Sequence, residues 1–376
     1  MIQLNCWNEY DTLKTVILGT IYSDDKIPKL YNDAEQEYFI KIVNGTNEEL
    51  KNLETILKQN NIKVLRPTQP ENINEDSSYQ AYPLINMRDF HMVYGNIMFI
   101  TNGPYKERRF SSLWLEDLTN QIINDNNLVI SANEINLQNN LGKNYEEMIL
   151  DLENYFQVKF QKKLKIKNKE NFHRLIDNFS EENNDEDWFL KHNFYNANKN
   201  TFHTASILKM NDICFMSQFS GSNTGKKWMK NWLKTLNVSP IELPIVGHID
   251  ATCCIVNQDT IITHRYIKHY DNFFKKIHYV DMDQEEYNNY EKLSEEEIFI
   301  PSLYYKKWQP LFHNVRKSIN ALTIRPNVVL LDFYDKDFYK KLKNDGIEAI
   351  YIKWSHSKFW EGGLHCITCD IERRPE

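Results

Sequence analysis

The sequence has few cysteines, and their spacing is irregular. Six are spread over 376 residues, with Cys253 and Cys254 adjacent and Cys366 and Cys369 three positions apart. This pattern excludes a disulfide framework and favours a reducing compartment. A structural zinc site is disfavoured because the Cys366-x-x-Cys369 motif has no second C-x-x-C partner. A thioredoxin-type redox pair would need an N-terminal β-α-β setting, whereas this motif lies near the end of the chain.

Long apolar runs and clusters of basic charge are absent as well. No apolar run reaches the roughly 18 residues of a membrane span, and residues 1–4 lead into the chain without a signal or transit pattern. The formal net charge is -7 and the pI about 5.9, and the basic residues are scattered, which argues against nucleic acid as the partner. We therefore expect a cytoplasmic protein that acts on a small molecule.

The chain does contain enough apolar material for a large core. Hydrophobic residues make up 41% and aromatic residues 13% of the sequence, which excludes a disordered chain. Its length suits two domains or one large α/β domain.

A short strand-like run recurs through the chain. The five runs cover residues 13–18, 95–100, 211–216, 258–262 and 326–331, and four of them begin at a turn of similar chemistry. In four cases a helical stretch and then a second strand follow the run. The helical stretches cover 47–59, 226–236, 270–276 and 335–343, and the strands that follow them cover, in the same order, 61–65, 241–243, 277–280 and 347–352. Five such units could close into a ring.

Residues 131–200 interrupt this pattern. They are rich in Asn, Lys and Glu and contain an acidic run at 181–187. We predict a divergent, partly helical and solvated insertion within one domain that spans 1–376.

Polar residues of catalytic type lie shortly upstream of the repeated strands. They are Arg88, Asp89, His203, His248, Asp250 and Ser318. Cys366 joins them, because it would lie upstream of the first strand if the units close into a ring. Around a common axis they would converge at its centre. His248 and Asp250 are two apart in a predicted strand, so both would point to one face. Such a set suits attack on a planar cationic carbon, because carboxylates hold a guanidinium, a thiolate attacks it and a histidine moves the proton.

Each of these residues also has an ordinary structural interpretation. Arg88-Asp89 fits an ion pair, and His248-x-Asp250 fits a surface or core pair. Arg265 would either anchor a substrate carboxylate or lie on the surface. Ser318 and Asn320 would each either line the pocket or pack at the edge of the core. His365 points away from the nucleophile if its segment is extended, so we leave it out of the mechanism.

Several motifs resemble the glycine/inosamine-phosphate amidinotransferase family. They are Asn8-Glu9-Tyr10-Asp11, Met87-Arg88-Asp89, Gly247-His248-Ile249-Asp250-Ala251-Thr252 and Gly362-Gly363-Leu364-His365-Cys366-x-Thr368-Cys369-Asp370. The resemblance runs in order along nearly the whole chain and is weakest across 131–200. It implies a pentein fold: a five-bladed α/β-propeller of β-β-α-β modules with pseudo-fivefold symmetry.

The resemblance also implies a reaction and roles for the residues. The family moves an amidino group from arginine to an acceptor amine through a cysteine adduct. Cys366 would be the nucleophile and His248 the general acid/base, while Asp89 and Asp250 would bind the guanidinium. We expect small-molecule partners, a guanidino donor and an amine acceptor. No metal and no organic cofactor is implied, since the thiolate supplies the chemistry. The oligomeric state stays open, with a homodimer among the alternatives.

One motif departs from the family. Its Phe-Asp-Ala-Ala pattern, with a further catalytic aspartate, is here Phe202-His203-Thr204-Ala205, so His203 takes the place of a carboxylate. Three outcomes stay open: Asp89 and Asp250 suffice beside a neutral His203, the donor is not arginine, or catalysis is lost. A deiminase or dihydrolase with water as acceptor, and a binding protein without catalysis, are the alternative functions.

Overall fold

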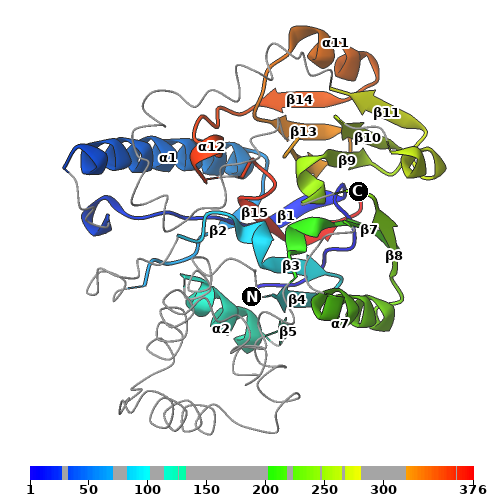
Figure 1. Ribbon diagram of the computed structural model, residues 1–376, viewed down its shortest axis with the longest axis horizontal. Helices are drawn as coiled ribbons and strands as arrows, with labels where there is room; N and C mark the ends of the chain where they lie inside the picture. The colour runs from blue at the N-terminus through cyan, green and yellow to red at the C-terminus, as the bar shows by residue number, and fades with distance from the viewer. Residues whose placement is uncertain are drawn as a thin grey trace, which may run out of the picture.

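The computed structural model describes residues 1–27, 33–70, 83–101, 114–125, 127–132, 202–217, 223–245, 248–264, 267–280, 319–360 and 362–376. Arg265, Ser318 and residues 133–200 of the predicted insertion lie outside these ranges. The described residues form five three-stranded sheets, with β15 and β1 near the middle of the view in Figure 1. The predicted α/β fold of five repeated modules is confirmed.

All five sheets share one pattern of strand directions. The predicted runs are the middle strands: β1 (Thr12–Leu18), β4 (Ile97–Ile100), β7 (Ile213–Ser217), β10 (Thr260–Thr263) and β13 (Val328–Leu331). An inner strand pairs antiparallel with each: β15 (Thr368–Arg374), β3 (His91–Tyr94), β6 (Ile207–Met210), β9 (Cys253–Asn257) and β12 (Leu322–Arg325). An outer strand pairs parallel: β2 (Lys63–Leu65), β5 (Leu128–Ser131), β8 (Ser239–Leu243), β11 (Lys276–Tyr279) and β14 (Glu348–Tyr351).

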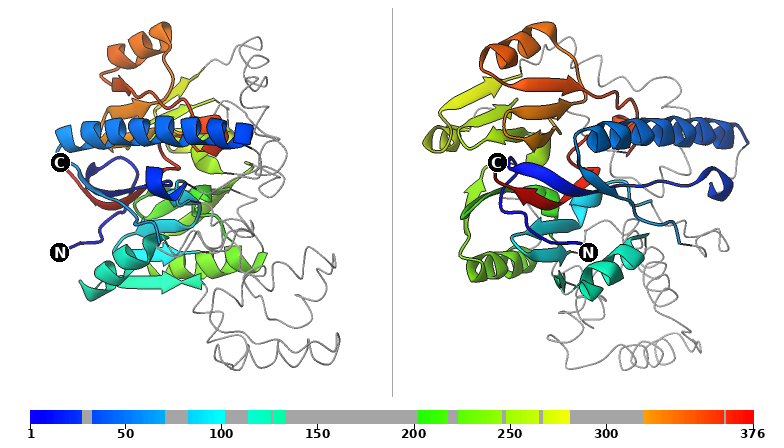
Figure 2. Two further views of the ribbon diagram at one scale, coloured as in Figure 1. Left: turned by 90° about the vertical axis from the view of Figure 1, so that its left-hand side faces the viewer. Right: turned by 180° about the vertical axis from the view of Figure 1, so that it is seen from behind.

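Helices carry the chain from middle to outer strands, because parallel neighbours need a crossover. They are α1 (Asp33–Gln59), α2 (Glu116–Asn124), α7 (Asn223–Thr235) and α11 (Lys336–Asn344), and they lie on the periphery (Figures 1 and 2). The prediction of a helix at 270–276 is wrong: the fourth module has a 3-10 helix, Lys268–Asn272, and β11 already begins at Lys276. Tyr270 and Phe274 pack on Phe215 of β7, so this short segment joins the core shared by the third and fourth modules. The short α12 (Ser357–Trp360) precedes β15.

Left-handed residues explain the recurring turn chemistry. Gly95, Asn211 and Asn327 join inner to middle strands at φ of 60°, 60° and 65°. Asn61 and Asn237 follow α1 and α7 in the same conformation. Glycine and asparagine enter this region at lower cost than other residues, so they mark the same point in the second, third and fifth modules.

The C-terminal strand closes the ring. β15 pairs antiparallel with β1, in a register that sets Val16 opposite Asp370. The N-terminal segment then crosses the inner ends of other modules through bridges from Cys6 to Gly95 and from Asn8 to Met210. This path brings Glu9 to the axis. Within the described ranges, no helix is both long and apolar enough to cross a membrane.

Short helical turns precede the inner strands and determine where the site forms. Three are the 3-10 turns Met87–Asp89, Thr204–Ser206 and Ile249–Ala251. The prediction that His248 and Asp250 share a strand is therefore wrong, since His248 directly precedes a turn that contains Asp250. The Thr252 N–H donates to the Ile249 carbonyl (2.9 Å) and closes that turn before β9 begins. Like turns at like ends of the inner strands gather their side chains on the axis.

Candidate active site

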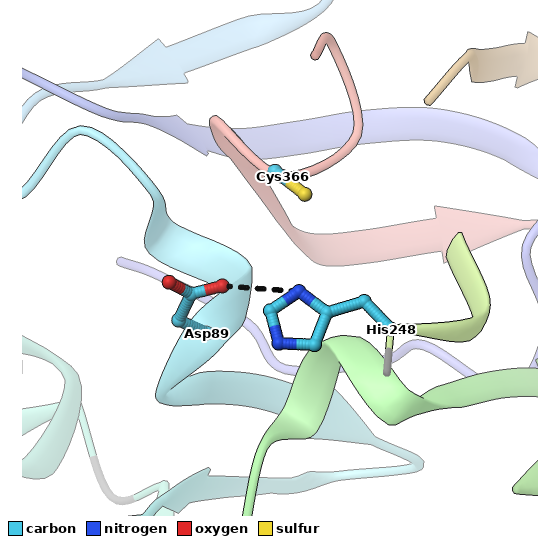
Figure 3. Close-up of side chains that lie close together, drawn as sticks. All are labelled: Asp89, His248 and Cys366. Carbon is cyan, nitrogen blue, oxygen red and sulfur yellow. Dashed lines mark ion pairs between the residues drawn. The ribbon is translucent and has the colours of Figure 1, made fainter. Parts of the chain in front are cut away.

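Three side chains from three modules face one another at this end of the axis. One ligand-type atom each of Asp89, His248 and Cys366 lies within 4.8 Å of the other two. Figure 3 shows the Asp89 carboxylate directed toward the ring of His248, with the Cys366 sulfur above that ring. Asp89 and Cys366 are 1% and 3% exposed, whereas the His248 side chain is 25% exposed. The structure therefore brings together these three residues, which the sequence predicted to converge.

Cys366 lies in a helical turn, where the Ile367 N–H donates to the Gly363 carbonyl (3.1 Å). Its thiol donates to Asp250 Oδ2 (3.3 Å) and accepts from Asn320 Nδ2 (2.9 Å), while the Cys366 N–H donates to Asn320 Oδ1 (2.7 Å). Burial and the charges of Asp250 and Asp89 raise the pKa of the thiol well above its ordinary value. Without a bound cation, Cys366 is therefore a thiol at neutral pH.

Two glycines allow the turn to approach its neighbours. A Cβ on Gly362 would lie 2.0 Å from Asn86 Oδ1, and one on Gly363 would lie 2.5 Å from the Asn320 Cβ. Both distances are shorter than van der Waals contact. Gly363 is required because Asn320 must reach both the sulfur and the backbone of Cys366, and Gly362 because the Asn86 side chain lies against it.

Asp250 is buried, and its two oxygens differ. Oδ2 accepts from the Cys366 thiol and from His365 Nδ1 (2.8 Å), whereas Oδ1 is buried without a hydrogen-bond partner among the described residues. Burial raises the pKa of Asp250, but the hydrogen bond and charge of His365 outweigh it and lower the pKa below its ordinary value. The site therefore holds an anion with one unpaired oxygen, which is costly unless a ligand donates to it.

The two predicted catalytic histidines contact each other. His248 Nε2 lies 3.0 Å from His203 Nδ1, and His248 Nδ1 lies 3.7 Å from Asp89 Oδ1. One proton lies between the imidazoles, so one ring donates and the other accepts. His203 thus contacts His248, the residue that the resemblance makes the general acid/base, and a neutral His203 supplies no negative charge there.

His365 was left out of the mechanism on the condition that its segment is extended, and that condition does not hold. Its segment is a helical turn, not an extended strand, and its ring bridges Asp250 and Glu9, with Nε2 3.2 Å from Glu9 Oε2. Glu9 comes from the other end of the chain, so no local spacing signals the contact. Asn320, predicted to line the pocket or to lie at the edge of the core, is buried and bonds both the sulfur and the backbone N–H of Cys366.

Below these residues is an axial network, defined as Glu9, Arg88, Lys209, Asp370 and Arg373. Arg88 Nη2 bonds Asp370 Oδ1 (2.9 Å), not the adjacent Asp89, and Arg373 Nε donates to Asp370 Oδ2 (2.7 Å). Lys209 Nζ lies 3.5 Å from Glu9 and 3.8 Å from Asp370. Burial raises the pKa of Asp370, but Arg373, Arg88 and Lys209 outweigh it and hold the pKa far below the ordinary value.

Asp89, His248 and Cys366 are also of types that bind a metal ion. Such an ion would leave Asp250 Oδ1 unpaired, because that oxygen is not in the set. A planar cation with several N–H donors would satisfy the Asp250 and Asp89 carboxylates together. The donor set therefore fits an organic cation better than a metal. Arg265 and Ser318, the other predicted substrate contacts, lie outside the described residues.

The chain has distant sequence relatives. It is 23% identical over 178 residues to inosamine-phosphate amidinotransferase 1 of Streptomyces glaucescens, covering 46% of this chain and 47% of that protein. It is 24% identical over 178 residues to the mitochondrial glycine amidinotransferase of Gallus gallus, covering 46% and 39%. The chain thus aligns with less than half the length of each relative. No family model matches it.

Solved structures match over nearly the whole chain. The inosamine-phosphate amidinotransferase of Streptomyces griseus superimposes with a TM-score of 0.63 at 16% identity, covering 100% of this chain and 98% of that one. A dimethylarginine dimethylaminohydrolase superimposes with a TM-score of 0.52 at 10% identity, covering 95% and 99%. These matches show that the chain has the fold of the amidinotransferases and of dimethylarginine dimethylaminohydrolase, and that part of its sequence is distantly similar to amidinotransferases.

Proposed function

We propose that this protein is an amidinotransferase that moves the amidino group of arginine, or of a related guanidino donor, to an acceptor amine. The observation that carries the proposal is the unpaired Oδ1 of the buried Asp250 beside the Cys366 thiol. Donation from a guanidinium to this oxygen and to Asp89 would bring its central carbon next to the sulfur. The amidinotransferase relatives support the transferase assignment.

Donor binding would itself activate Cys366. The thiol pKa is held up by burial and by the charges of Asp250 and Asp89, and a bound guanidinium offsets both charges. The proton then passes to His248. Nδ1 is the ring nitrogen not engaged by His203, so it can accept a proton when the Nε2–H donates to His203 Nδ1.

The transfer then proceeds in two displacements. The thiolate of Cys366 bonds to the guanidinium carbon, and the carbon–nitrogen bond to the donor breaks as protonated His248 returns its proton to the leaving amine. Ornithine leaves, and a cationic amidino group stays on the sulfur, beside Asp89 and Asp250. The acceptor amine attacks the same carbon and gives a proton to His248, and the carbon–sulfur bond breaks to regenerate Cys366.

A hydrolase is the second candidate, favoured by the fold match to dimethylarginine dimethylaminohydrolase. It would use the same cysteine, but ammonia would leave in place of ornithine, and water would then displace citrulline from the sulfur. Its products differ from those of the transferase, since arginine would give citrulline or ammonia without any amine present.

The test is to incubate the protein with arginine labelled in its guanidino carbon and with a panel of primary amines that includes glycine. The proposal predicts ornithine and a labelled guanidino product in equal amounts, both lost in Cys366→Ala. Cys369→Ala is the matched control, because the thiol of Cys369 donates to the His91 carbonyl (3.5 Å), outside the site. Label in citrulline or urea would identify a hydrolase, and no product with any amine would favour a binding protein.

A further inference from the structure

We infer that His365 is a positioning residue, held as an imidazolium between Glu9 and Asp250, and that it directs the Asp250 carboxylate toward a cationic ligand. The inference rests on the proposed function only for the guanidino nature of that ligand. Nothing in the local sequence pattern assigns His365 such a role.

The hydrogen bonds of the ring require two protons. Nδ1 lies 2.8 Å from Asp250 Oδ2 and Nε2 lies 3.2 Å from Glu9 Oε2, and ionised carboxylates only accept hydrogen bonds. A neutral ring has one N–H and would leave one of these contacts as two facing lone pairs. With both carboxylates ionised, His365 donates from both nitrogens.

The surrounding charges also call for this cation. Asp89, Asp250, Glu9 and Asp370 are four buried carboxylates, and the permanent cations near them are Arg88, Lys209 and Arg373. The imidazolium of His365, itself 4% exposed, supplies the fourth positive charge. Of the charged groups around His365, Glu9 and Asp250 favour the cation and Arg88 opposes it. His248 and Cys366 are the other titratable groups close to Asp250.

The position of His365 determines which oxygen of Asp250 meets the ligand. His365 and the Cys366 thiol both engage Oδ2, so the carboxylate is held from one side and Oδ1 is left for an incoming N–H. Without the imidazolium, burial would favour the protonated, neutral form of Asp250. The pocket would then lose its preference for a cation.

The experiment compares two reagents that alkylate Cys366 without turnover: cationic 2-chloroacetamidine and neutral iodoacetamide. The ratio of their rate constants reports the negative charge beside the sulfur. We expect this ratio to fall about tenfold in His365→Gln at pH 7, as one charge-assisted contact is lost. It should fall further toward pH 5.5, whereas the wild-type ratio stays flat. His356→Gln is the matched control, because His356 pairs with Glu49 (3.2 Å) away from the site and should leave the ratio unchanged.

A His365→Gln ratio equal to the wild-type ratio at every pH would overturn the inference. A second measurement does not depend on the ligand or on the fold of the variant: the ¹⁵N spectrum of histidine-labelled wild-type protein. The inference expects one ring that stays doubly protonated at pH 8, in contact with Cys366 protons, and a neutral ring there overturns it. If that imidazolium is present but the wild-type protein shows no preference for the cationic reagent, the proposed function fails and the protonation of His365 stands.

Discussion

Two groups of buried charges lie on the axis of this protein, and they differ in how fully they are paired. In the axial network, each of Glu9, Arg88, Lys209, Asp370 and Arg373 faces at least one opposite charge within hydrogen-bond or ion-pair distance. At the mouth of the site, Asp250 keeps an unpaired oxygen and the Cys366 thiol meets two anions. We therefore assign the paired layer to supporting the ring and, under the proposed function, the incompletely paired layer to binding the ligand.

The largest effect should come from the nucleophile. Cys366→Ser should lower amidino transfer about ten-thousandfold or more, since a hydroxyl at this position has no comparably nucleophilic form at neutral pH. Its stability should change little, because the hydroxyl can still donate to Asp250. Product assays and urea unfolding measure the two quantities. A loss of stability equal to that of an axial-network variant would contradict the separation of the two layers.

Asp370→Asn should instead destabilise the fold. It removes the shared partner of Arg88 and Arg373, which leaves Arg373 without the anion it pairs with and Arg88 with Glu9 alone (3.7 Å). Breaking a buried pair of this kind costs about 3–5 kcal/mol. Urea unfolding measures the loss. A variant as stable as the wild type would show that the network contributes no net stability.

Asp250→Asn should lower activity more than stability, which is the opposite of the effect expected for Asp370→Asn. The amide keeps an acceptor for His365 but loses the charge that faces the ligand, so kcat/KM for the donor should fall about a hundredfold to a thousandfold. The free energy of unfolding should fall by less than in Asp370→Asn. Steady-state kinetics with arginine and the same unfolding assay measure the two effects. An Asp250→Asn variant less stable than Asp370→Asn would contradict the difference between the two groups of charges.

The sequence predicted the repeated strands and the gathering of Asp89, His248, Asp250 and Cys366 because both depend on patterns that recur. Middle strands follow marked turns, and catalytic residue types precede the inner strands. The local conformation at the site was not predictable, because a 3-10 turn of three residues, such as Ile249–Ala251, has no period to detect.

Contacts between distant parts of the chain were missed for a different reason. His365 meets Glu9 only because β15 pairs with β1 and closes the ring. Arg88 was interpreted beside its neighbour Asp89, yet the turn directs it to Asp370. Such pairings depend on the closed ring, so spacing within one motif does not contain them.

The pH dependence of alkylation at Cys366 distinguishes the site without a ligand from the site with a bound cation. The pKa of Cys366 is raised by burial and by two carboxylates, so the thiolate fraction grows with pH throughout the range below that pKa. Alkylation by neutral iodoacetamide should rise about tenfold per pH unit from pH 7 to 9 without a plateau. A plateau near pH 7 would mean that the thiolate is already formed without a ligand.

The smallest effect concerns the second histidine. His203→Asp would place a carboxylate near His248 Nε2, where His203 Nδ1 now lies at 3.0 Å. A charged partner stabilises the protonated form of His248 that hands its proton to the leaving amine, so turnover should rise about tenfold. His203→Asn, which adds no charge, is the control. Equal rates in the wild type and in His203→Asp would show that the imidazole serves as well as a carboxylate.

The most direct test of the central claim is to mix the protein with arginine alone, quench with acid within milliseconds to seconds, and measure the mass of the peptide that contains Cys366. We expect one amidino group on the Cys366 sulfur, and we expect it to be lost when an acceptor amine is added before the quench. An unmodified Cys366 at every time point, or an adduct on another side chain, would contradict it.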